Sequence, residues 1–168
     1  MDIAETDAKK DWAYLSEGGA TIVFTYVGPF HPEFTGLVLR LRKCGREQEA
    51  LSVPRLAPEV EERDDPSIVF QEVVTSKLIP SEHLPQLRVV KVSSQWLRDL
   101  REASEVQRPV KRSTKDTIDA TRQKGVLATD LVGGKGWAIE IKVCCLFTFT
   151  RLSNVISLSA EVGISSFF

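Results

Sequence analysis

The stretch DWAYLSEGGATIVFTYV, Asp11–Val27, places a glycine pair between two runs of strand-forming residues. Large and small residues alternate over Asp11–Leu15, and Thr21–Val27 is rich in β-branched and aromatic residues. Both patterns favour strands, and Ser16–Ala20 between them is typical of a turn. The stretch therefore predicts an antiparallel hairpin. Glycines at its tip would let backbone N–H groups approach a ligand closely, because no Cβ intervenes.

Two interpretations of this turn are open. It could be a lid over nucleotide phosphates, as in glycine-rich kinase loops, or a plain hairpin turn. The next segment, Gly36–Lys43, predicts a third strand with Leu39 on one face and Arg40 and Arg42 on the other. Arg40 could hold phosphate, because its planar fork bonds two oxygens at once. Taken alone, each segment favours the simpler interpretation. The glycine stretch would be a plain hairpin turn, and the arginines of Gly36–Lys43 would lie on a solvated edge of the sheet.

Two helices are predicted farther along the chain. Asp65 and Pro66 are a typical N-cap and first helical residue, and Pro80 ends the helix. Its apolar residues are expected to bury against the sheet: Ile68, Val69, Phe70, Val73 and Val74. Ser93 or Ser94 caps the second helix. Its core stripe is expected to be Trp96, Leu97, Leu100 and Ala103.

The remaining strands are Leu87–Val92, Gly125–Ala128 and Trp137–Lys142. In the last strand, Glu140 and Lys142 are two residues apart and leave the same face. Strands that are mainly antiparallel, with two helices, predict a compact α+β lobe.

Composition narrows the function classes. A net charge of −1 over 168 residues gives no reason to expect direct nucleic-acid binding, and no apolar run is long enough for a membrane span. The three cysteines form neither a disulfide framework nor a zinc pattern, so a reducing compartment is expected. His31 and His83 have no partner at ligand spacing and are read as loop residues, so no metal ligand is nominated.

A basic cluster at Arg108, Lys111 and Arg112 has two readings. It could hold a polyanion, or it could be a solvated loop, which is the commoner outcome for a run of charges.

Four stretches together resemble the N-terminal part of inositol-pentakisphosphate 2-kinases, and the glycine stretch is most similar to the fungal members. They are Asp11–Tyr26, Phe34–Lys43, Arg108–Arg112 and Trp137–Lys142. The resemblance covers Met1–Lys142. It implies a two-lobed kinase-like fold with ATP bound between the lobes, of which this chain supplies the N-terminal lobe.

The resemblance also implies a reaction. The family transfers the γ-phosphate of ATP, with Mg²⁺, to the 2-hydroxyl of inositol 1,3,4,5,6-pentakisphosphate and so makes the hexakisphosphate, phytate. The expected partners are therefore ATP and inositol pentakisphosphate. A monomer in the nucleus or cytoplasm is expected.

Carried over by position, the resemblance implies a set of ATP-binding residues. The loop over the phosphates is matched by Gly18, Gly19, Ala20 and Thr21, and an arginine that contacts the nucleotide is matched by Arg40. The hinge beside adenine is matched by Thr129, Asp130 and Leu131. A motif near the nucleotide is matched by Glu140 and Lys142. Arg112 matches an arginine that holds a substrate phosphate.

The family pattern is expected to stop at Lys142. Residues 143–168 carry two charged residues, Arg151 and Glu161, and are interpreted as a foreign apolar tail. It is expected to be disordered, or to come from a retained intron or a wrongly placed exon boundary. The C-terminal lobe, with the catalytic and metal-binding aspartates, is expected to be absent, so no catalytic residue is nominated. The leading hypothesis is a truncated, inactive 2-kinase. The alternatives are a non-catalytic module that binds inositol phosphates through Arg108, Lys111 and Arg112, and a small α+β interaction domain.

Overall fold

The computed structural model describes residues 2–47, 62–131, 140–144 and 161–165. The chain divides into two compact units, Met1–Gly133 and Gly134–Phe168, and each is described by itself. No helix among the described residues is long and apolar enough to cross a membrane.

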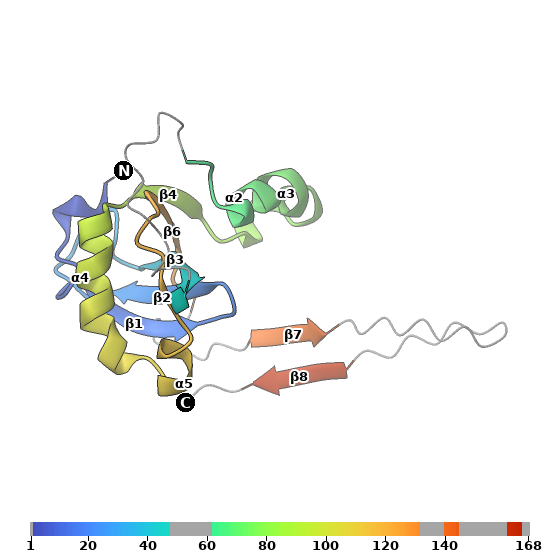
Figure 1. The fold of residues 1–168 in the computed structure, drawn as a ribbon. Coiled ribbons are helices and arrows are strands. Elements are labelled where there is room, and N and C mark those ends of the chain that lie inside the picture. The colour runs from blue at the N-terminus through green and yellow to red at the C-terminus, as the bar shows by residue number, and fades with distance from the viewer. Residues whose placement is uncertain (1, 48–61, 132–139, 145–160, 166–168) are drawn as a thin grey trace, which may run out of the picture. The chain divides into compact units, whose positions relative to one another are not determined.

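The first unit is built on a six-stranded antiparallel sheet (Figure 1). Its strands are β1 (Trp12–Glu17), β2 (Thr21–Tyr26), β3 (Leu37–Gly45), β4 (Leu87–Lys91), β5 (Asp116–Ile118) and β6 (Lys124–Thr129). The order is β1-β2-β3-β6-β4, and β5 pairs separately with the end of β3. The predicted glycine hairpin is confirmed, with β1 running to Glu17 at the edge of the turn.

Short helical segments connect the strands. They are η1 (Ile3–Glu5), α2 (Pro66–Phe70), η2 (Gln71–Thr75), α3 (Ser76–Leu78), η3 (Ser81–His83), α4 (Ser94–Ser104), η4 (Glu105–Gln107) and α5 (Val110–Ser113). The α+β class is therefore confirmed for the described residues, and the antiparallel sheet with few helices is consistent with part of the expected kinase-like lobe. The segment expected to be a loop after Glu105 instead contains η4, α5 and β5.

The core lies between one face of the sheet and α4 (Figure 1). The sheet contributes Ile22, Phe24, Leu39, Leu41 and Leu127, and α4 contributes Trp96, Leu97 and Leu100. The Ser93 side chain accepts a hydrogen bond from the Trp96 amide, so the predicted cap and the predicted stripe are both confirmed, except that Ala103 is only half-buried. Because residues alternate along a strand, the other face of the sheet carries Arg40 and its neighbours.

The helical segment after Asp65 differs from its prediction. Its start at Asp65 and Pro66 is confirmed. Of the five apolar residues expected to bury against the sheet, however, Ile68 alone is buried. Val69, Phe70, Val73 and Val74 are 49%, 61%, 54% and 37% exposed. The reason is geometric: residues 68–70 are consecutive, so on a helix they point in different directions and cannot share one buried face.

The second unit contains an antiparallel hairpin of β7 (Glu140–Cys144) and β8 (Glu161–Ser165). Glu140 pairs with Ser165 and Lys142 with Gly163. Five residues of the 143–168 segment are therefore in β8, while 145–160 and 166–168 lie outside the described residues. The expected strand at 137–139 also lies outside them.

Candidate functional site

Three of the predicted nucleotide-binding elements lie along β3. The residue that follows the glycine turn, Thr21, pairs with Arg42 near one end of the strand, and Thr129 of β6 pairs with Leu37 at the other end. Arg40 lies between them, with Val23 on one side and Val126 on the other. Residues directly opposite one another in an antiparallel ladder share a face, so Arg40 lies on the same face as these two valines.

The surroundings of Arg40 on this face are largely apolar. The neighbours that share it are Val23, Thr25, Val38, Val126 and Ala128. Three of these, Val38, Val126 and Ala128, are buried, and α4 lies on the opposite face. We call this apolar surrounding of Arg40 the apolar floor; apolar side chains with a few polar groups among them are the lining that small-molecule sites commonly have.

Arg40 itself is half-buried and forms no side-chain hydrogen bond or ion pair with any other described residue. Its neighbour on the same strand face, Arg42, differs in this respect, because Asp65 binds it at two points. Among the described residues, therefore, Arg40 is the cation on this face of β3 whose side chain remains available to bind an anion.

The glycine turn is open on its outer side. Gly18 N donates to Thr21 O at 2.9 Å, and Lys43 N donates to Ala20 O at 3.0 Å, so the base of the turn is fixed. A Cβ added at Gly18 or Gly19 would meet nothing within 4 Å, and neither residue has a positive φ. Neither local packing nor backbone conformation therefore requires glycine at these two positions. Close approach of a ligand to the backbone is another physical reason for glycine to be there.

The segment Thr129–Leu131 is tied to two neighbouring strands. Thr129 N donates to Gln86 O at 3.2 Å, and Asp130 N donates to Gly36 O at 3.0 Å. Thr25 Oγ1 also donates to an Asp130 carboxylate oxygen at 3.2 Å. The segment is therefore held at the end of the apolar floor, but these two backbone N–H groups are already engaged. A nucleotide would have to use other backbone groups of the segment.

Arg112 lies beside the glycine turn although 94 residues separate them in sequence. Its Nη1 atom donates to Gly18 O at 3.1 Å. Both Arg112 and Lys111 are exposed on α5. The structure thus brings the residue expected to hold a substrate phosphate next to the residues expected to hold ATP phosphates.

The prediction that Arg108 belongs to the same polyanion site is wrong. Its side chain is 1% exposed, and its guanidinium binds Glu17 and Asp116 at 2.9 and 2.8 Å. A planar donor group next to two carboxylates satisfies its hydrogen bonds inside the protein, so it has none to offer an external anion. Arg108 is a structural residue.

Sequence reasoning missed a buried ionic cluster formed by Glu17, Lys43, Arg108 and Asp116. Lys43 Nζ lies 3.1 Å from Glu17 Oε2 and 3.0 Å from Asp116 Oδ2. Burial alone would raise the pKa of Glu17, but hydrogen bonds from Arg108 and Lys43 outweigh it and lower that pKa. The four residues come from four separate segments, so no local sequence pattern could have revealed the cluster.

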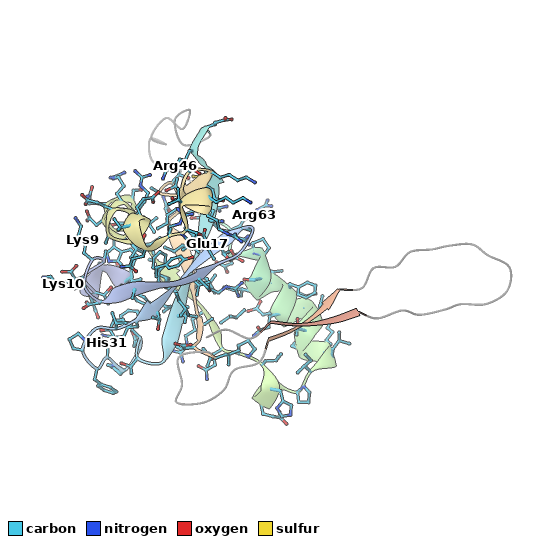
Figure 2. All side chains as sticks on the ribbon, turned by 90° about the horizontal axis from the view of Figure 1, so that it is seen from below. Lys9, Lys10, Glu17, His31, Arg46 and Arg63 are labelled. Atoms are coloured by element: carbon cyan, nitrogen blue, oxygen red, sulfur yellow. The ribbon has the colours of Figure 1, made fainter. Side chains whose placement is uncertain are left out.

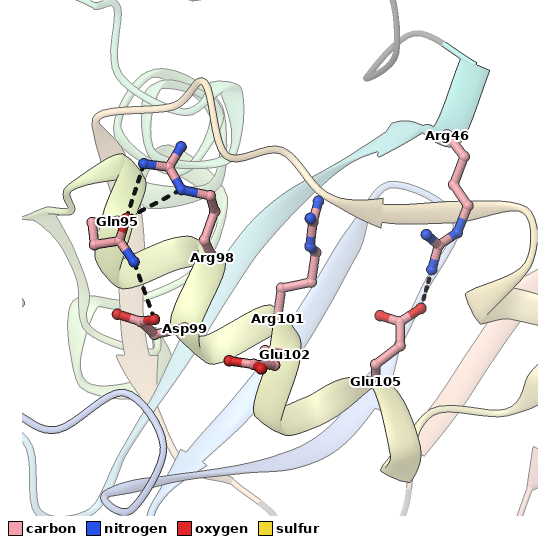
Figure 3. A pocket seen from close by; sticks show the side chains of 7 residues that line it. All are labelled: Arg46, Gln95, Arg98, Asp99, Arg101, Glu102 and Glu105. Atoms are coloured by element: carbon pink, nitrogen blue, oxygen red, sulfur yellow. Dashed lines mark hydrogen bonds and ion pairs between the residues drawn. The ribbon is translucent and has the colours of Figure 1, made fainter.

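A groove of about 480 Å³ lies along α4 and has none of the predicted site residues in its lining (Figure 3). Its lining residues are Arg46, Gln95, Arg98, Asp99, Arg101, Glu102 and Glu105. Arg98 bonds to Gln95 and Arg46 pairs with Glu105, so these cations are engaged by their neighbours. The groove is a surface of mixed, paired charges.

Two of the predicted site residues belong to the second unit. Glu140 and Lys142 are on β7, and their side chains lie outside what the structure describes. Among the described residues, no group of His, Cys, Asp and Glu side chains could hold a metal ion.

Comparison with known proteins shows the family to which the chain belongs. The sequence model of the family described as inositol-pentakisphosphate 2-kinase matches residues 14–154, and so runs past Lys142, where the expected N-terminal lobe ends. Inositol-pentakisphosphate 2-kinases from two strains of Cryptococcus neoformans var. neoformans serotype D are each 34% identical over 140 residues, which cover 79% of this chain and 31% of the relative. The enzyme of the same name from Arabidopsis thaliana is 27% identical over 173 aligned positions, which cover 88% and 38%. The chain thus spans about a third of the length of these relatives. Because the family match covers most of the sequence, this chain belongs to the inositol-pentakisphosphate 2-kinase family.

Proposed function

We propose that the Arg40 face of the sheet binds ATP as the nucleotide-binding part of an inositol-pentakisphosphate 2-kinase. The reaction is transfer of the γ-phosphate to the 2-hydroxyl of inositol 1,3,4,5,6-pentakisphosphate, giving inositol hexakisphosphate. One observation carries the proposal: Arg40, without a partner among the described residues, lies on an apolar face between an open glycine turn and the segment Thr129–Leu131.

Each element has a role that its chemistry supports. The apolar floor around Val126 and Ala128 takes the adenine ring, with Thr129–Leu131 at its edge. The backbone of the glycine turn covers the phosphates, and the fork of Arg40 bonds their oxygens. Phosphoryl transfer depends on positioning and charge stabilisation more than on covalent chemistry, so cations and backbone donors are the groups that it requires.

Mg²⁺ would accompany ATP and would supply positive charge that offsets the charge of its phosphates. The described residues offer no group of side chains that fits the ion, so no step is assigned to it here. From family resemblance, Glu140 and Lys142 would lie near the nucleotide.

The inositol phosphate would be held in part by α5. Arg112 is proposed to bind one of its phosphates, because an exposed guanidinium beside Gly18 is close to where the ATP phosphates would lie. Five phosphates on one small ring make the substrate a dense polyanion, which a single arginine cannot neutralise. Further basic residues are therefore required.

We also propose that these 168 residues alone bind ATP without turning over the pentakisphosphate. They span about a third of the length of the relatives, and no described residue is assigned as general base. Action as a monomer, in the nucleus or cytoplasm, is proposed as well. A net charge of −1 supports a role without direct binding of nucleic acid or membranes.

An intron origin for residues 143–168 is a separate proposal. Their two charged residues, against 45 in the whole chain, support it. Sequencing the transcript across the Lys142 codon tests it: a message that only ever encodes the Val143 continuation would contradict it.

The proposed function is tested by titrating the purified chain with ATP and Mg²⁺ and following the backbone amides by NMR. The expected shifts fall at Gly18–Thr21, at Arg40 and at Thr129–Leu131, and not along α4. The same preparation is then assayed for transfer of radioactive phosphate to the pentakisphosphate. Absence of ATP binding, or shifts confined to the α4 groove, would contradict the proposed nucleotide site. Robust transfer would contradict the proposed lack of turnover.

A further inference from the structure

The buried ionic cluster lies directly beneath the proposed phosphate-binding turn. Glu17 is the last residue of β1 and immediately precedes Gly18. Its side chain is 1% exposed, and those of Lys43 and Arg108 are 3% and 1% exposed. Figure 2 shows Glu17 among the strands, whereas the labelled Lys9 and Lys10 lie at the margin of the first unit.

The cluster is closed and balanced in charge. The carboxylate of Glu17 binds both Lys43 and Arg108, and the carboxylate of Asp116 binds the same two cations. Each anion therefore has two cations, and each cation has two anions. Glu105 adds a more distant contact, 3.6 Å from Arg108.

Such a cluster restricts geometry more than it adds stability. Removing four charges from water is unfavourable, and apolar residues of similar volume often serve a core as well or better. Charge-assisted hydrogen bonds are directional, however, and apolar contacts are not. A cluster that connects β1, β3, β5 and the segment before α5 fixes how these four elements meet.

Two segments of the proposed phosphate site, the glycine turn and α5, are held by this arrangement. The glycine turn is attached to the cluster at its first end through Glu17. Near its second end it is attached through Lys43 of the neighbouring strand β3, whose backbone N–H donates to Ala20 O at 3.0 Å. Helix α5 is attached at both ends, because Arg108 precedes it and Asp116 follows it. Arg112 of α5 then reaches Gly18 O from the outside.

From this geometry we propose that Glu17, with Lys43, Arg108 and Asp116, forms a positioning cluster that sets the glycine turn and α5 for the phosphates of a bound nucleoside triphosphate. The cluster touches no ligand itself. It acts on the phosphate end of the site, because Thr129–Leu131 is attached at the opposite end of β3 through separate contacts with Gln86 and Gly36. This inference rests on the proposed function.

The test compares nucleotide ligands that differ only in their phosphates. Dissociation constants of ATP and adenosine are measured by NMR titration for the unsubstituted chain and for Glu17→Gln, which keeps the shape and removes the charge. Glu102→Gln is the matched control, because Glu102 pairs with Lys9 at the surface, where both side chains are exposed. Glu17→Gln is expected to weaken ATP binding about tenfold and to change adenosine binding less than twofold. Glu102→Gln should change neither.

The outcomes separate the inference from the function on which it rests. Equal weakening of ATP and adenosine by Glu17→Gln, or no weakening of either, overturns the positioning role while ATP binding by the unsubstituted chain stands. No ATP binding by the unsubstituted chain overturns the proposed function and this inference with it. Arg108→Lys is the second variant if Glu17→Gln does not fold. This substitution keeps every charge of the cluster and removes the planar guanidinium, so a selective loss of ATP affinity is again expected. If Arg108→Lys bound both ATP and adenosine as tightly as the unsubstituted chain, the positioning role would be overturned.

Discussion

Arg42 on β3 and Asp65 at the start of α2 form a two-point ion pair, with Arg42 Nε 2.6 Å from Asp65 Oδ2 and Arg42 Nη2 2.9 Å from Asp65 Oδ1. The same carboxylate accepts hydrogen bonds from the amide and hydroxyl of Ser67 at 2.8 and 2.7 Å. One side chain thus caps the helix and attaches it to the sheet. The attachment leaves Arg42 engaged and Arg40 available, which is the difference on which the proposed site depends.

Replacing Asp65 by Asn is expected to destabilise the first unit by about 2 kcal/mol. Asn is an equally good N-cap, so the loss comes from the ion pair and from an arginine left partly buried without its anion. Asp65→Ala removes the cap as well and should cost about 1 kcal/mol more. Urea unfolding measures both, and an Asp65→Asn chain as stable as the unsubstituted one would show that the pair contributes nothing.

The same pair predicts a pH dependence. Burial would raise the pKa of Asp65, but hydrogen bonds from Arg42 and Ser67 outweigh it and lower the pKa from 3.8 to about 2. Because the folded state holds this proton less readily than the unfolded state, the stabilisation is complete above about pH 4 and is lost as the pH falls toward 2. After allowance for solvent screening it amounts to about 1–2 kcal/mol.

The measurement is the difference in unfolding free energy between the unsubstituted chain and Asp65→Asn, followed from pH 6 to pH 2. The difference should shrink below about pH 4. Glu17, whose pKa is also lowered, is present in both chains and cancels to first order. A difference that stays constant down to pH 2 would contradict the assignment.

Local signals in the sequence were enough to predict most of the strands and the two longer helical segments, though not η4, α5 and β5. The glycine hairpin, the cap at Asp65, the helix end before Pro80 and the core stripe on α4 each depend on a few adjacent residues, and each is found. The alternation of β3 also placed Arg40 on the face opposite the core. These features follow from periodicity, which a sequence carries directly.

Contacts between distant segments were not predictable in this way. Arg42 and Asp65 are 23 residues apart, and Arg108 and Glu17 are 91 apart. The sequence pattern predicted one basic cluster over Arg108–Arg112. In the structure, however, the chain turns at Pro109, so that the Arg108 side chain is buried while that of Arg112 is exposed. Charge alone did not distinguish a buried arginine from an exposed one, because the partners that decide its burial lie elsewhere in the chain.

Replacing Arg40 by Met is expected to weaken ATP binding by about 10- to 100-fold and to leave stability nearly unchanged. A charge-assisted bond to phosphate has that magnitude, while no described residue loses a hydrogen bond or ion pair when the guanidinium is removed. Arg98→Met on the exposed face of α4 is the matched control and should bind ATP normally. Titration calorimetry and a thermal melt separate the two effects. A large stability loss with unchanged ATP affinity would make Arg40 a structural residue.

Two glycine substitutions should behave in opposite ways. In Gly125→Ala the new Cβ would lie 2.9 Å from Leu41 Cδ2 and 3.2 Å from Leu39 Cδ1, in the middle of the core. Overpacking of this kind costs about 1–3 kcal/mol. In Gly19→Ala the Cβ would meet nothing within 4 Å, so stability should hold while ATP affinity falls if the turn covers phosphates. Equal stability of the two variants, measured by denaturant unfolding, would contradict the close packing around Gly125.

Neighbouring apolar residues on α2 should differ sharply in their contribution to stability. Ile68 is 7% exposed and Phe70 is 61% exposed, although the sequence pattern predicts burial for both. Truncating a buried isoleucine removes its transfer free energy and leaves a cavity, so Ile68→Ala should cost about 2–4 kcal/mol. Phe70→Ala leaves no cavity and should change stability by less than about 0.5 kcal/mol, even though phenylalanine is the larger side chain. Urea unfolding of the two variants in the same chain tests the orientation of the helix. A Phe70→Ala loss as large as that of Ile68→Ala would mean that the exposed face of this helix is covered in solution, and it would restore the burial that the sequence pattern predicts.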